Sequence, residues 1–99
     1  MAEQSKNFVS FETQGADFYR ADSKLGELID ELITLGRDEG QTLAELEAGR
    51  KYIKAPVARR DFIEGLLIKP LRKLQSNAPK RAKVIADEYL NWLFKNLGQ

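Results

Sequence analysis

The stretch Lys80–Leu97, with the sequence KRAKVIADEYLNWLFKNL, decides the fold of this chain. Its apolar residues recur at spacings of three and four, so they share one side of a helix. They fill about half of the helical circumference, and they are Ala82, Ile85, Ala86, Tyr89, Leu90, Trp92, Leu93 and Leu97. Pro79 suits the start of this helix, and Gly98 suits the left-handed position after its end. A stripe this wide predicts a helix that more than one neighbour must cover.

A second helix is predicted within residues 17–35. Its apolar face consists of Leu25, Leu28, Ile29, Leu32 and Ile33. Acceptable N-caps are Asp17, Asp22 and Ser23. Gly36 stands where a left-handed residue ends a helix.

The segment Thr42–Glu45 has the pattern of a capping box, in which each side chain bonds the other residue's backbone amide. It predicts a short helix over residues 43–53. The apolar stripe of this helix is narrow, so either the helix is short and peripheral, or Gly49 beside the stripe allows another backbone to come close.

A fourth helix is predicted over residues 57–75, because five apolar residues hold one register: Ile63, Leu66, Leu67, Leu71 and Leu74. Pro70 interrupts it by removing an amide and crowding the carbonyl of Leu66. Either this helix kinks at Pro70 or a second short helix begins there. The unbroken register favours the kink.

Residues 1–16 are predicted to be a flexible tail, with Phe8 and Phe11 resting on the core. The alternative is a short edge strand or a docking segment, but no second strand is evident for it to pair with. The rest of the chain, residues 17–99, is one domain. The predicted fold is therefore all-α, a small single-domain bundle of four to five helices, one of them kinked at Pro70.

Composition excludes several kinds of chemistry. The chain of 99 residues has no Cys and no His, so ordinary catalytic triads and the usual zinc ligands are absent. No spacing resembles a calcium or phosphate loop. We therefore predict no enzyme activity, no cofactor and no metal. No apolar run approaches the roughly 20 residues that span a bilayer, and the first residues do not form a secretory signal, so the expected location is the cytoplasm.

Charge is divided between the two halves of the chain. Residues 1–49 carry a net charge of −7 and residues 50–99 a net charge of +8, although the whole chain is only +1. The cations that could bind an anionic partner are Arg50, Lys51, Lys54, Arg59, Arg60, Lys69, Arg72, Lys73, Lys80, Arg81 and Lys83. The simpler interpretation is a solvated face that the acidic half balances.

Large apolar residues within the wide stripe of the last helix or just outside the stripes are candidates for an oligomer or partner interface, with burial in the bundle as the alternative. They are Phe62, Ile68, Tyr89, Trp92 and Phe94. A helix-turn-helix over residues 24–35 and 43–53 is a weaker possibility, because the turn between them is longer than usual.

These patterns favour a non-enzymatic adaptor or regulatory protein that acts by protein–protein binding. The predicted partner is another protein, one that is acidic, or a second copy of this chain associating through the last helix. The alternative is a sequence-tolerant nucleic-acid-binding protein that uses the basic face over residues 50–83. Small charged proteins of this kind are typical of bacterial and phage accessory factors, an analogy of size and composition.

Overall fold

Four helices carry the fold in residues 7–36 and 40–98, the part of the chain that the computed structural model describes. The helix α2 spans Ala16–Leu35, α3 spans Gly40–Tyr52 and α6 spans Lys80–Asn96. The remaining helix is continuous over residues 60–77 and consists of α4 (Arg60–Ile63), a π-helical turn (Glu64–Ile68) and α5 (Lys69–Asn77). The predicted small all-α bundle is confirmed.

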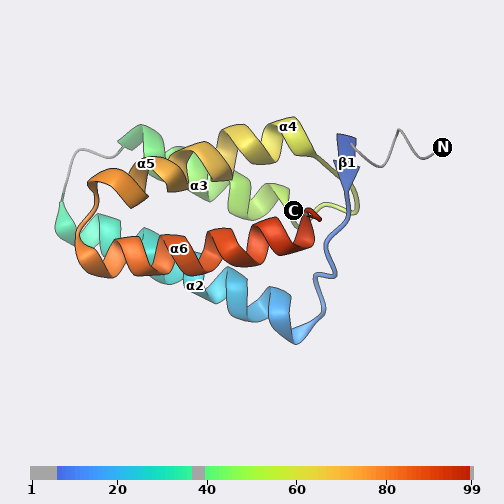
Figure 1. The fold of residues 1–99 in the computed structure, drawn as a ribbon, viewed down its shortest axis with the longest axis horizontal. Helices are drawn as coiled ribbons and strands as arrows, with labels where there is room; N and C mark the ends of the chain where they lie inside the picture. The colour runs from blue at the N-terminus through green and yellow to red at the C-terminus, as the bar shows by residue number, and fades with distance from the viewer. Residues whose placement is uncertain (1–6, 37–39, 99) are drawn as a thin grey trace.

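The helices form a closed ring in which α6 lies between α2 and α5, as Figure 1 shows. The helix α3 packs against α2 and against the π-helical turn, which closes the ring. The predicted stripes supply the core, and the stripe of α6 is covered from two sides. Ile33 is an exception, because its side chain is 58% exposed instead of sharing the buried face of α2. It lies near the end of α2, where no neighbouring helix covers that side.

The disturbance expected at Pro70 takes the form of the π-helical turn. Pro70 cannot donate to the carbonyl of Leu66, and its ring crowds that carbonyl. The chain widens just before it, and the amide of Lys69 donates to the carbonyl of Glu64, five residues back. Because the helix continues through this turn, Leu67, Leu71 and Leu74 all stay buried in the core.

Gly49 brings α3 against this turn. A Cβ atom built at Gly49 would lie 2.5 Å from Cγ of Leu67 and 3.2 Å from Cβ of Leu66. The π-helical turn therefore does come close to Gly49, but the atoms that contact it belong to side chains and not to the backbone that was predicted.

The N-terminal segment is held by strand pairing. The strand β1 (Phe8–Val9) pairs antiparallel with β2 (Ala58–Arg59), next to the start of α4 in Figure 1. The preferred prediction of a frayed tail is therefore wrong for residues 8 and 9, and residues 1–6 lie outside the described part. The predicted helix over 57–75 begins later, at Arg60, because β2 uses the preceding residues in the sheet.

The helix ends test the capping predictions. Gly36 follows α2 with φ 64° and donates to the carbonyl of Ile33, and Gly98 has φ 80°, so both glycines occupy the left-handed positions predicted for them. The prediction of a capping box that begins the helix at Thr42 is wrong. The helix α3 already includes Gly40, and Thr42 is a buried residue within its first turn.

Candidate functional site

The first predicted cation, Arg50, lies within the molecule and not on a binding surface. Its Nε and Nη2 donate to the two carboxylate oxygens of Asp22 on α2, at 2.9 and 3.2 Å. Gly26 makes room for this, since a Cβ there would lie 3.0 Å from the guanidinium nitrogens. These hydrogen bonds raise the pKa of the Arg50 guanidinium above its usual value. Arg50 therefore joins α3 to α2.

Three other cations of the 50–60 segment have partners as well. Lys54 reaches the same Asp22 carboxylate, with its Nζ 3.8 Å from Oδ2. Arg59 bonds Asp61 at 2.9 Å, and Arg60 donates from Nη2 to the carbonyl of Leu97 at 2.6 Å. Arg60 thus supplies a donor and a positive charge to the C-terminal end of α6.

Lys51 is the one cation of the 50–60 segment that has neither an ion pair nor a side-chain hydrogen bond with another described residue. The helix-turn-helix interpretation needs Arg50, Lys51 and Lys54 to be free for bases. Two of the three are held by Asp22, so the arrangement does not favour it.

The acidic and basic halves also meet between α2 and α6. Arg81 lies 3.3 Å from a carboxylate oxygen of Glu31 and 3.9 Å from one of Glu27, and Lys24 lies 3.6 Å from one of Glu88. Part of the charge division seen in the sequence is therefore neutralised inside one molecule.

The cations that remain cluster on α5 and the first turn of α6. We call the set Lys69, Arg72, Lys73, Lys80 and Lys83 the basic face. None of its members forms an ion pair with another described residue. Four are exposed and Lys83 is half-buried. Because α5 and α6 pack side by side, the basic face spans two adjacent helices.

The basic face also contains apolar and acidic groups. The Arg72 guanidinium lies 5.4 Å from the centre of the Phe94 ring, and both Phe94 and Ile68 are half-buried against the core. Asp87 accepts a hydrogen bond from Gln75, which links α6 to α5 within the same face. Two predicted interface residues, Ile68 and Phe94, thus lie beside the predicted cations.

The other three predicted interface residues lie apart from the basic face. Tyr89 is only 1% exposed, so it belongs to the core and cannot contact a partner. Burial raises the pKa of its hydroxyl, which has no hydrogen-bond partner in the described part of the chain. Phe62 is 46% exposed and packs against Tyr52 beneath the Arg59 guanidinium, near β2.

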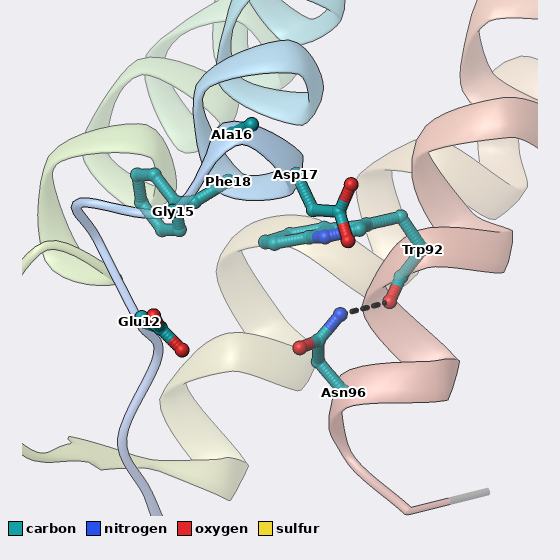
Figure 2. Close-up of a pocket in the computed structure, with 7 residues that line it drawn as sticks. All are labelled: Glu12, Gly15, Ala16, Asp17, Phe18, Trp92 and Asn96. Carbon is teal, nitrogen blue, oxygen red and sulfur yellow. Dashed lines mark hydrogen bonds between the residues drawn. The ribbon is translucent and has the colours of Figure 1, made fainter.

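Trp92, the fifth, lines a hollow at the C-terminal end of α6, and none of the residues lining it belongs to the basic face. Figure 2 shows this hollow, which has a volume of about 330 Å³. We call it the Trp92 hollow, and its lining residues are Glu12, Gly15, Ala16, Asp17, Phe18, Trp92 and Asn96. Sequence reasoning identified Trp92 but missed the others, because they come from the coil before α2, its first turn and the last turn of α6. No local pattern links these segments.

The described part of the chain holds no cluster of three acidic, His or Cys side chains arranged to ligate a metal ion. None of its helices has the length and apolar content needed to cross a membrane. The chain matches no family model, no curated protein and no solved structure in the comparisons with known proteins.

Proposed function

We propose that this protein is a non-enzymatic adaptor that binds an acidic protein partner through the basic face. The observation that carries the proposal is that five cations of two adjacent helices lack ion-pair partners among the described residues, whereas most other cations of the same stretch have them. Because no described carboxylate neutralises these cations, their charges are available to an anionic partner.

The neighbours of these cations favour a protein over a phosphate backbone. Exposed ion pairs alone contribute only about 0–1 kcal/mol each, so a stable complex also needs apolar contact. Phe94 and Ile68 offer that contact inside the basic face. Asp87 stands in the same face and would repel a row of phosphates, while a protein can place a donor opposite it.

The proposal places this adaptor in the cytoplasm. The absence of Cys from the chain fits a reducing compartment, in which structural disulfides are rare.

Fluorescence anisotropy tests the proposal with three labelled probes: an acidic peptide with interspersed leucines, single-stranded RNA and duplex DNA. The peptide should bind at low salt and keep much of its affinity at physiological salt, because part of the contact is apolar. The double variant Lys69→Glu, Lys73→Glu should weaken peptide binding about tenfold or more.

The matched control is Lys51→Glu, Lys95→Glu, which makes the same change in net charge at two exposed cations outside the basic face. It should bind the peptide as the wild type does. Equal loss in both variants would show that only net charge matters and would refute a defined face. Tighter binding to DNA or RNA than to the peptide, with a steep fall as salt increases, would make the protein a nucleic-acid binder instead.

A further inference from the structure

The Trp92 hollow carries an inference beyond the basic face. It is built from side chains of three segments, the coil around Glu12, the first turn of α2 and the last turn of α6. None of its lining residues belongs to the basic face. Trp92 at the hollow and Phe94 in the basic face are two positions apart on α6, so they point to roughly opposite sides of the helix. The hollow and the basic face can therefore contact different parts of a partner, or different partners.

Three side chains that line the hollow carry oxygen atoms that accept hydrogen bonds, and the indole N–H of Trp92 is a donor among the polar side-chain groups there. Glu12 and Asp17 each supply a carboxylate, and Figure 2 shows Asp17 beside the indole in the view and Glu12 on the coil across the hollow. The amide Nδ2 of Asn96 already donates to the backbone carbonyl of Trp92 at 2.8 Å, which leaves its Oδ1 to accept. Asp17 is only loosely engaged, since its contact with Arg20 is 3.5 Å long and both side chains are largely exposed. Such a lining suits a ligand that carries several N–H donors and a positive charge.

The aromatic wall of the hollow is held in place by its neighbours. The Phe11 ring stacks on the indole of Trp92 with centroids 5.5 Å apart, and the Phe18 ring meets it edge-on at 5.7 Å. Tyr89 packs against the indole at 5.4 Å. An indole fixed in this way loses little conformational freedom when a ligand arrives. Aromatic rings attract cations, and a guanidinium can also stack on them.

We infer that the Trp92 hollow binds the guanidinium of an arginine side chain presented by a protein partner. A guanidinium offers five N–H donors in a plane, which the Glu12, Asp17 and Asn96 oxygens can share around one flat group. An anion would meet two carboxylates there. This site is separate from the basic face, so it does not depend on the proposed function of that face.

Titration of the full chain by NMR tests the inference. Trp92 is the only Trp in the chain, so the indole N–H gives a single side-chain signal that reports on the hollow. The probe is N-acetyl-arginine amide, which resembles an arginine within a peptide. The matched probe is N-acetyl-citrulline amide, which has nearly the same shape and no charge. The arginine probe should shift the indole signal in a saturable way, with a Kd on the order of millimolar, and the citrulline probe should not.

The double variant Glu12→Gln, Asp17→Asn should weaken this binding by about fivefold to tenfold. Its control, Glu45→Gln, Glu47→Gln, removes two carboxylates of α3 outside the hollow and should leave the titration unchanged. The variant Lys69→Glu, Lys73→Glu should also leave it unchanged, which separates this result from the test of the basic face.

The inference would be overturned by an equal response to the citrulline probe or by a response that does not saturate. An unchanged affinity in the Glu12→Gln, Asp17→Asn variant with native helicity would overturn it as well. Tighter binding of free arginine than of the blocked amide would also overturn it, since the ligand would then be the amino acid and not a protein side chain.

Discussion

The two parts of the basic stretch are alike in sequence and different in the folded molecule. Residues 50–60 contain five cations, four of which are bound within the molecule. Residues 69–83 contain six, of which only Arg81 forms ion pairs within the described part of the chain. The largest part of this difference arises because Arg50 and Lys54 meet the carboxylate of Asp22 on α2, whereas no described carboxylate forms an ion pair with the cations of α5. A cation's role therefore depends on which distant acceptor the fold places opposite it.

The largest difference between the two segments should appear when one cation is removed from each. Arg50→Ala should lower the free energy of unfolding by about 1.5–3 kcal/mol, because it leaves the half-buried Asp22 carboxylate without its two strongest donors. Lys73→Ala should change it by less than about 0.5 kcal/mol, as is usual for an exposed site. Urea denaturation measures both values. Similar losses in the two variants would mean that Lys73 also has a structural role.

The packing of α3 against the π-helical turn, which positions the 50–60 segment, can be tested by replacing each of two glycines with alanine. Gly49→Ala introduces a Cβ into Leu67, and overpacking of this kind costs about 1–3 kcal/mol, of which better helix propensity returns up to about 1 kcal/mol. Gly65→Ala meets no atom within 4 Å, so it should stabilise the chain by up to about 1 kcal/mol. Thermal and urea denaturation should therefore show that Gly49→Ala lowers the free energy of unfolding and that Gly65→Ala raises it. A stabilising Gly49→Ala would contradict the close contact between α3 and the π-helical turn.

The adjacent residues Arg59 and Arg60 in the 50–60 segment should differ in how much their substitution lowers the free energy of unfolding. Arg60→Met removes the donor to the Leu97 carbonyl and should cost about 0.5–1.5 kcal/mol. Arg59→Met removes an exposed ion pair with Asp61 and should cost about 0–1 kcal/mol. Amide exchange should show the added opening at the C-terminal end of α6 in the Arg60 variant alone. Faster exchange there in the Arg59 variant would argue against this assignment.

No loss of stability at neutral pH is expected from a substitution at Tyr89, which lies in the fields of Asp22 and Arg50. Tyr89→Phe removes a buried hydroxyl without a partner, whose desolvation costs free energy, so the variant should be at least as stable as the wild type. The folded state raises the pKa of Tyr89 above its ordinary value of 10.0, so the unfolded chain releases this proton first. The contribution of Tyr89 to the free energy of unfolding is therefore fully present below pH 10 and is lost as the pH rises above that value.

Urea denaturation from about pH 8 to 11 checks this dependence. Above pH 10 the Tyr89→Phe variant should lose stability less steeply than the wild type. The control is Tyr19→Phe, at a residue that is 73% exposed, and it should follow the wild type. Parallel curves for all three proteins would show that Tyr89 does not titrate as an interior group.

Local patterns predicted most of the helices and nearly all of the core, because burial of an apolar stripe follows from its spacing alone. The stripe of Leu25, Leu28 and Leu32, the wide stripe of α6 and the glycines that end α2 and α6 all lie where the sequence places them. Gly49 was also predictable as a point of close approach. Each of these features depends on neighbours within a turn or two of the same helix.

Features that join distant segments could not be found in this way. The pairing of β1 with β2 and the Asp22–Arg50 bond connect residues far apart in the chain, and the Trp92 hollow combines Glu12 with Asn96. The same holds for the basic face, since a list of cations does not say which of them have partners. Helix periodicity states which side of a segment is apolar, but ion pairing acts over a few ångströms between side chains that only the packing of the helices brings together. The local sequence therefore determines the helices and their buried sides. Which cations remain without an ion pair is decided only by the way α2, α3, α5 and α6 pack together.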